Sequence, residues 1–320
     1  MIAPLLASEL PLPLWRRGKV REVYHAPGDR LLIVGRIRAP STLGAWLAGA
    51  LLGLAGAIAQ GLFRNPLADP YLLGSASGAS LGVVLALAAT ALGGPATEVA
   101  TADWVARFRL VHAGFAGALL GVLLTLTLAR GAQQTTRLLL AGVVVGVILA
   151  AVSDLVTSAA PDALRGKQAF MLGSTGLLGW SNCAVLCAGL ALALPPSWRL
   201  ARALDALTLG GDTARSLGLP LPRVRAALVG VIALATGVAV SQTGLIAFVG
   251  LVAPHLVRRF APATHGYLLV ASAAAGGALL LMADVLARVL IAPQEIPVGV
   301  LTALLGGSYL IWLLHRGRGE

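Results

Sequence analysis

Long apolar stretches alternate with short polar connections along most of this chain. A helix needs about 20 apolar residues to cross the hydrocarbon core of a bilayer, and most of the stretches are close to that length. They predict an all-α, polytopic membrane protein with nine to ten transmembrane helices. The nine apolar runs lie at residues 43–63, 72–93, 109–129, 138–159, 182–197, 223–242, 244–259, 267–291 and 297–314.

Two of these runs, 182–197 and 244–259, are short, and residues 160–180 form a glycine-punctuated segment of intermediate hydrophobicity. Irregular backbone is tolerated at membrane depth only where protein or water satisfies its polar groups. The three segments therefore predict broken or partial helices that line a cavity. The alternative is a tilted helix in a locally thinned bilayer.

The N-terminal segment, residues 1–42, differs from the rest of the chain. Basic residues and prolines interrupt every window of it, so that no membrane helix is expected there. We interpret residues 1–42 as a polar lead-in and residues 43–320 as the transmembrane domain.

Composition supports a membrane protein. The chain is 58% hydrophobic and only 12% charged, whereas soluble proteins have roughly 25% charged residues. Its 39 glycines predict helices that approach each other closely, because small residues drive helix association in lipid. The net charge of +11 does not indicate nucleic acid here, because basic loops follow the positive-inside rule. Cys183 and Cys187 have no further Cys or His nearby and are interpreted as packing residues, so that no metal site is expected.

Residues 199–225 form a mixed polar stretch with five arginines between two apolar runs. Most loop Lys and Arg residues lie on the same side as this stretch, which predicts that it and the C-terminus are cytoplasmic. Within it, Leu207–Leu219 predicts a short helix that starts near Asp212 and ends at Gly218. Such a helix is suited to binding another protein, and the alternative is an arginine-rich loop that only sets topology.

The sequence contains no Walker A or His-Glu-x-x-His pattern, and no enzyme is predicted. Asp154 and Asp284 fall inside apolar runs, where an ionisable residue is a functional candidate. Asp284 has Arg288 four residues later and can form an ion pair on one helix face. Asp154 has no such local partner; it faces a water-filled path or is capped by a neighbouring helix.

Three longer motifs are more specific. The first starts Arg64-Asn-Pro-Leu-Ala-Asp-Pro, the second is Gly244-Leu-Ile-Ala-Phe-Val-Gly-Leu-Val-Ala-Pro-His-Leu-Val-Arg-Arg, and the third starts Glu295-Ile-Pro-Val-Gly-Val-Leu-Thr-Ala. Together they closely resemble the motifs of the permease family of ABC importers for iron-siderophores, haem and cobalamin. The resemblance runs from about Arg36 to Leu314.

The resemblance implies a homodimer in the bacterial inner membrane with ten spans in each subunit. It also implies two cytoplasmic ATPase subunits, which bind ATP and magnesium, and a periplasmic substrate-binding protein; the permease itself holds no cofactor. Family members have a hydrophobic span before the position of Arg36, and residues 1–35 offer none. We therefore expect a truncated or mis-assigned start.

The resemblance also implies roles for particular residues. In the family, short helices of the loop between the sixth and seventh spans contact the ATPase, and we name residues 199–225 the coupling segment. Its expected contact residues are Leu209, Gly210, Asp212, Ala214, Arg215, Leu217 and Gly218. Docking of the binding protein is expected at Arg38 and Arg288, with Arg36 as a substitute for the family arginine that Ser41 replaces. The translocation path is expected to be lined by Gly142, Val145, Gly146, Leu149, Met171, Leu172 and Val300.

The cargo is expected to be a metal chelate, with haem first and cobalamin or a ferric siderophore as alternatives. Arg165 and Lys167 at the outer mouth would attract the carboxylates of haem, or else would only extend towards lipid headgroups. An ion-coupled secondary transporter is the competing class, and it would need intramembrane acids such as Asp154 and Asp284 to act as a relay.

Overall fold

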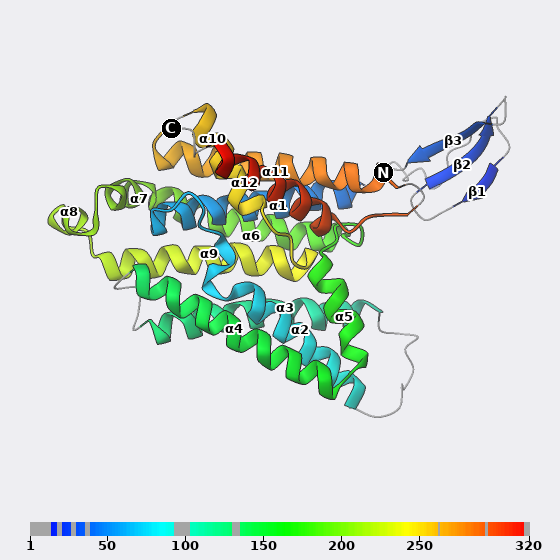
Figure 1. Ribbon diagram of the computed structural model, residues 1–320, viewed down its shortest axis with the longest axis horizontal. Coiled ribbons are helices and arrows are strands. Elements are labelled where there is room, and N and C mark those ends of the chain that lie inside the picture. The colour runs from blue at the N-terminus through cyan, green and yellow to red at the C-terminus, as the bar shows by residue number, and fades with distance from the viewer. Residues whose placement is uncertain are drawn as a thin grey trace.

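The computed structural model describes residues 14–17, 21–26, 30–35, 39–92, 103–129, 135–261, 263–291 and 294–316. Within these residues the chain is an elongated helical bundle preceded by three strands (Figure 1). The helices are α1 Ala39–Phe63, the 3-10 helix η1 Pro70–Leu73, α2 Ser75–Leu92, α3 Asp103–Leu128, α4 Thr135–Ala159, α5 Asp162–Leu172, α6 Trp180–Arg199, α7 Ala201–Thr208, α8 Gly211–Ser216, α9 Leu221–Thr243, α10 Val249–Phe260, α11 His265–Val289 and α12 Val298–Arg316.

The predicted membrane helices are partly confirmed. Among the described residues, six helices are long and apolar enough to cross a bilayer, namely α1, α3, α4, α6, α9 and α11. The apolar parts of α2 and α12 are shorter, and the run 244–259 forms a non-helical stretch followed by α10. The predicted count of nine to ten spans is therefore not confirmed, whereas a multi-pass helical membrane protein is.

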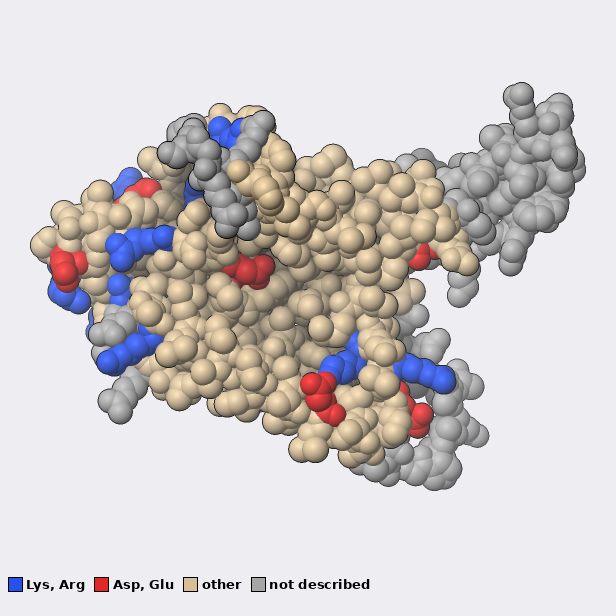
Figure 2. Space-filling model, viewed as in Figure 1, with Lys and Arg blue, Asp and Glu red and all other residues tan. Residues whose placement is uncertain are grey.

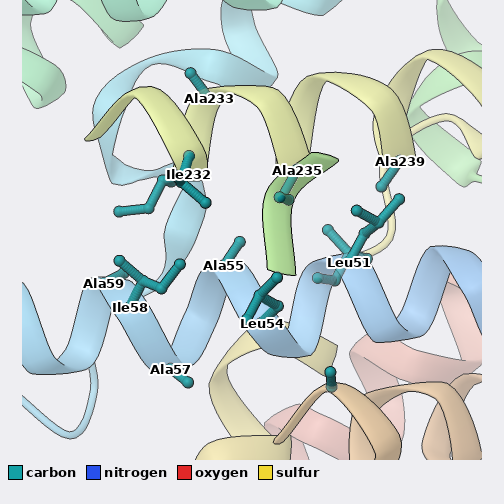
Figure 3. Packing of buried hydrophobic residues seen from close by; sticks show 14 of the residues in the cluster. Leu51, Leu54, Ala55, Ala57, Ile58, Ala59, Ile232, Ala233, Ala235 and Ala239 are labelled. Carbon is teal, nitrogen blue, oxygen red and sulfur yellow. The ribbon is translucent and has the colours of Figure 1, made fainter. Parts of the chain in front are cut away.

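Helix α1 lies at the centre of the bundle. In its most apolar window 83% of the residues are buried, against 28% for α4 and for α6. Leu51, Leu54 and Ile58 of α1 face Ile232 and Ala235 of α9, and alanines fill the space between the larger side chains (Figure 3). This row of small residues allows the two backbones to approach closely, as the glycine and alanine content predicts.

Glycines bring α2 against α3 in the same way. A Cβ atom added at Gly78 would lie 2.2 Å from the carbonyl oxygen of Gly117, and one at Gly82 would lie 2.1 Å from that of Ala113. Real Cβ contacts are never so short, so both positions require glycine. The close packing predicted from composition is thereby confirmed.

The partial helices are only partly where the sequence predicts them. Helix α5 has 11 residues and α10 has 12, in agreement with short helices near 160–180 and 244–259. The run 182–197 belongs instead to the 20-residue α6. This helix begins earlier than the apolar run, because the side chain of Asn182 accepts a hydrogen bond from the Gly179 N–H group, 3.0 Å, and caps its start.

Three short strands lie in the N-terminal segment, where the sequence predicts a polar lead-in without a membrane helix. β1 Leu14–Arg17, β2 Arg21–Ala26 and β3 Arg30–Gly35 form an antiparallel sheet in the order β1-β2-β3. The basic residues and prolines exclude a membrane helix without excluding strands. Val23 and Tyr24, then Ile33 and Val34, favour strands, and a Pro-Gly pair separates the two groups in the sequence.

Candidate functional site

The coupling segment lies at one end of the bundle, where α7 and α8 project at the left of Figure 1. Leu204 and Leu207 of α7 are buried, at 0% and 3% exposure, so this helix packs firmly on the bundle. Asp205, on the same helix, accepts a hydrogen bond from the backbone N–H group of His265 at 3.0 Å, and its carboxylate lies 2.6 Å from Nδ1 of that ring. Helix α7 is therefore attached to the first residue of α11.

Helix α8 and its flanking residues expose most, but not all, of the predicted contact residues. Leu209 and Leu217, on either side of it, are 66% and 63% exposed, whereas Ala214 is fully buried. Arg215 and Asp212 form an exposed ion pair at 3.0 Å. Gly210 and Gly218 have φ values of 111° and 83°, which L-residues with side chains rarely adopt. The two glycines thus bound a short helix whose apolar flanks are exposed.

Charge is distributed unequally along the molecule. Lys and Arg side chains gather at the end that carries α7 and α8, a smaller group lies over α5, and most of the visible surface between them is uncharged (Figure 2). An uncharged belt between two charged ends is typical of a protein that spans a bilayer. The larger basic end agrees with the predicted cytoplasmic position of the coupling segment.

The predicted lining residues of α4 face the inside of the subunit. A Cβ atom at Gly142 would meet the carbonyl oxygen of Leu72 at 2.0 Å, and Val145 and Leu149 are buried with Leu81 of α2. Gly146 is partly buried. The exposed side of α4 carries different residues, namely Leu140, Val143, Val144, Val147, Ile148 and Leu155.

Three interruptions of helical structure meet beside the end of α5. The N–H group of Ser174 donates to the carbonyl of Thr243 at 2.7 Å, and that of Leu245 donates to the carbonyl of Phe170 at 2.9 Å. The N–H group of Gly299, in the first turn of α12, donates to the carbonyl of Gly173 at 3.4 Å. The end of α5, the stretch before α10 and the start of α12 are therefore bonded to one another through their backbones.

Of the other predicted lining residues, Met171 and Leu172 are exposed at this junction, at 46% and 44%, and Val300 is partly buried. The structure therefore separates the predicted lining into an exposed pair at the end of α5 and a buried set on α4. Sequence could not make this distinction, because both sets are equally apolar.

A polar cluster lies next to this junction. Asp284 of α11 accepts a hydrogen bond from the hydroxyl of Thr175 and pairs with Arg288 at 2.5 Å. We call Thr175, Asp284 and Arg288 the outer cluster. It borders a pocket of about 270 Å³ that Glu295 also lines. The ion pair between Asp284 and Arg288 is as the spacing predicts, but the sequence offered no signal for the partnership with Thr175, which is 109 residues away.

Of the predicted docking residues, Arg288 has a side chain only 12% exposed, because it is engaged with Asp284. Arg36 and Arg38 lie outside the described residues. Arg165 is exposed, whereas Lys167 forms an ion pair with Asp154 of α4. Asp154 is therefore capped by a neighbouring helix, which is one of the two alternatives that the sequence left open.

No group of three or more His, Cys, Asp or Glu residues that could hold a metal ion occurs within the described part of the chain. Binding of ATP and magnesium by a partner, and the absence of a cofactor from this chain, stay predictions.

Comparisons with known proteins agree with the three motifs. The chain is 40% identical over 304 residues to the vitamin B12 import system permease protein BtuC of Salmonella paratyphi A, which covers 92% of this chain and 89% of that protein. It is 40% identical over 288 residues to the hemin transport system permease protein HmuU of Yersinia pestis, covering 89% and 83%.

A solved structure has the same fold. The structure of an inward-facing conformation of a metal-chelate type ABC transporter matches with a TM-score of 0.78 and 26% identity, covering 88% of this chain and 86% of that one. The FecCD transport family matches residues 17–316, nearly the whole chain. The chain therefore belongs to the FecCD transport family.

Proposed function

We propose that this chain is the membrane-spanning permease subunit of an ATP-driven importer for a metal chelate. The observation that carries the proposal is the short helix α8, bounded by Gly210 and Gly218 and flanked by exposed leucines, at the basic end of a FecCD-family bundle. Relatives at 40% identity are named as permeases for vitamin B12 and for hemin. Both names describe transport components, in agreement with the prediction that this chain is not an enzyme.

The proposed partners are a second copy of the chain, two cytoplasmic ATPase subunits and a periplasmic binding protein. Leu209 and Leu217 support the ATPase contact, because two large apolar side chains exposed beyond the membrane belt favour a protein partner. The apolar face of α4 supports the second copy. Leu140, Val147 and Leu155 are each more than 60% exposed on it. A path between two copies would be lined by this face and by Met171 and Leu172.

The described charges make a secondary transporter a poorer explanation. A proton or ion relay needs acids that are free to exchange a cation. Asp154 is paired with Lys167, and Asp284 with Arg288 and Thr175. Both intramembrane candidates are therefore already occupied by side chains of this chain.

Haem is the cargo we expect first, and cobalamin is the alternative. The expectation rests on Arg165, which is exposed and makes no ion pair among the described residues. Two copies would place two such guanidinium groups around the mouth, where they would attract carboxylates. Because Asp154 neutralises Lys167, this attraction is weaker than four basic residues would provide.

Uptake by proteoliposomes tests the proposal. The chain is reconstituted with its ATPase subunit and binding protein, and accumulation of haem and of cobalamin is measured with and without internal ATP. We expect ATP-dependent uptake of one chelate that survives a proton uncoupler. Uptake that persists without ATP and collapses with the uncoupler would contradict the proposal. An ATPase variant that binds but does not hydrolyse ATP is the matched control.

A further inference from the structure

Helix α11 connects the coupling segment at one end of the molecule with the outer cluster at the other. The proposed function requires that movement at the first end changes the structure at the second. The first residue of α11, His265, contacts the coupling segment, and its last two turns carry Asp284 and Arg288 of the outer cluster. With 25 residues it spans about 37 Å, at 1.5 Å per residue. In Figure 1 it runs along the long axis, from the end with α7 and α8 towards the opposite end.

The contact at the start of α11 fixes it to α7. Asp205 approaches both the N–H group and the ring of His265. A carboxylate at a helix N-terminus also interacts favourably with the helix dipole. His265 is buried, at 8% exposure, and its ring packs against Gly61 of α1, where an added Cβ would lie 2.8 Å from Nε2. A displacement of α7 is therefore transferred to α11 without an intervening flexible segment.

Between its ends, α11 is packed backbone to backbone on α1. A Cβ atom added at Gly49 would lie 2.3 Å from the carbonyl oxygen of Gly276, and one added at Gly53 would lie 2.2 Å from the carbonyl oxygen of Ser272. Gly276 is held equally closely, because a Cβ there would lie 2.3 Å from the carbonyl oxygen of Gly49. Helices in such contact move together, since no side chain lies between them to change rotamer.

The contact near the other end of α11 reaches the turn that connects α5 with α6, residues 173–179. Thr175 is 2% exposed, and its hydroxyl donates a hydrogen bond to one carboxylate oxygen of Asp284. The second oxygen of Asp284 accepts a hydrogen bond from Arg288. The same turn is bonded by Ser174 to the end of α9 and by Gly173 to the start of α12. Thr175 is thus the point where α11 holds the junction of interrupted helices.

We propose that α11 transmits movement of the coupling segment to the turn 173–179, and that Thr175 and Asp284 are the positioning residues for this transmission. The proposal rests on the proposed function, because it assumes that an ATPase moves α8 and α7. Rigid-body displacement of packed helices is an established form of such gating. A contiguous route alone does not show coupling, so the test must measure coupling between the two contacts.

The first experiment compares Thr175→Val with Thr175→Ser in the reconstituted transporter. Valine keeps the branched shape and loses the hydroxyl, whereas serine keeps the hydroxyl. We expect Thr175→Val to lower the amount of chelate imported per ATP hydrolysed about tenfold, the loss expected for a buried hydrogen bond to a charged group. Thr175→Ser should retain at least about half of the wild-type import per ATP hydrolysed, because its hydrogen bond to Asp284 is kept.

A second readout follows the turn itself. Leu177→Cys introduces a thiol at a side chain that is 70% exposed, in a background carrying Cys183→Ala and Cys187→Ala. The labelling rate with a membrane-impermeant maleimide should depend on the nucleotide bound to the ATPase. In the presence of Thr175→Val this dependence should disappear, and with Thr175→Ser it should persist. Unchanged nucleotide dependence with Thr175→Val would overturn the proposal.

A double-mutant cycle that combines Asp205→Asn with Thr175→Val tests whether the contacts at the two ends of α11 act in series or independently. If α11 carries the movement, either substitution already interrupts it, and the pair should reduce import per ATP no further than the more severe single variant. Effects that multiply would show two independent contacts and would also overturn the proposal. Failure of the wild-type complex to import any chelate with ATP would instead reject the proposed function.

Discussion

Lys167 of α5 forms an ion pair with Asp154 of α4, across the connection between these helices. The Lys167 side chain is 16% exposed, and that of Asp154 is 72% exposed. The ammonium group is thus covered while the carboxylate faces outwards. Of the two basic residues expected at the mouth, only Arg165 presents an uncompensated charge among the described residues.

This pairing leads to unequal effects of neutralising the two basic residues. Arg165→Gln should lower the initial rate of haem uptake, because the exposed guanidinium attracts carboxylates over long range. Lys167→Gln should lower it less, since it removes a positive charge that Asp154 already balances. The rates are measured at saturating binding protein, with basal ATPase activity as the control. If the variant with both substitutions imports haem at the parent rate, the mouth has no role in attracting cargo.

The second prediction concerns Gly218. An added Cβ would meet nothing within 4 Å, so a substitution acts only through the backbone, at φ 83°. Gly218→Val should strain this conformation by about 1–2 kcal/mol and displace the apolar flank at Leu217. We expect lower chelate uptake and lower stimulation of the ATPase by the permease.

Two matched variants control for Gly218. Asn tolerates the left-handed conformation, so Gly218→Asn should retain most of the activity. Gly230 of α9 also has open space around its Cβ but is helical, and Gly230→Ala should leave uptake unchanged. Wild-type stimulation with Gly218→Val would contradict the coupling role of this residue.

The third prediction concerns docking. Arg38→Glu and Arg288→Glu should both weaken binding of the periplasmic protein, measured by surface plasmon resonance on the transporter in nanodiscs. The loss for Arg38→Glu should shrink as salt rises, because attraction between charges on two approaching proteins is screened over about 8–10 Å. Equal affinity for both variants and the wild type at low salt would remove the docking proposal.

Arg288→Glu should differ in one respect. It leaves Asp284, whose side chain is 3% exposed, without its cation and beside a second carboxylate. Removing one partner of a buried pair costs about 3–5 kcal/mol. We therefore expect a lower unfolding temperature and a loss of binding that salt does not restore. Arg288→Lys, which keeps the charge, should recover most of the stability.

The fourth prediction concerns pH and Asp69, in the connection between α1 and α2. Burial raises the pKa of this carboxyl from 3.8 to about 6, although the hydrogen bond from the Tyr71 N–H group at 2.8 Å opposes the shift. Between pH 3.8 and about 6, the Asp69 carboxyl is deprotonated in the unfolded chain but stays protonated in the folded chain. Stability should therefore fall as pH rises from about 4 to about 6 and then level off.

Asp69→Asn removes this dependence and keeps an oxygen that accepts from Tyr71. At pH 7 it should stabilise the protein by no more than about 3 kcal/mol, at 1.36 kcal/mol per pKa unit. Asp69→Ala should be less stable than Asp69→Asn by about 1 kcal/mol, since the helix cap is lost. Thermal unfolding in detergent across pH 4–8 measures both. If Asp69→Asn showed the same dependence of unfolding temperature on pH as the wild type, a group other than Asp69 would be responsible for that dependence.

The sequence by itself determined the class of protein and its family. Apolar runs near membrane length are local properties, and they predict a multi-pass helical protein whatever their packing. The motifs starting at Arg64, Gly244 and Glu295 carried the resemblance that the family match confirms. The ion pair of Asp284 with Arg288 was equally accessible, because it depends only on a spacing of four residues within one helix.

Only the tertiary structure decided which faces and which distant residues meet. The middle of α4, residues 138–152, is apolar all round, so its sequence has no polar side to show that Val145 is buried while Val147 is exposed. The contacts of Asp154 with Lys167 and of Asp205 with His265 join separate helices, and that of Thr175 with Asp284 joins the turn 173–179 to α11. Their formation depends on how the helices are rotated and shifted against one another. Close glycine contacts between backbones set that arrangement, and they arise only once the bundle is assembled.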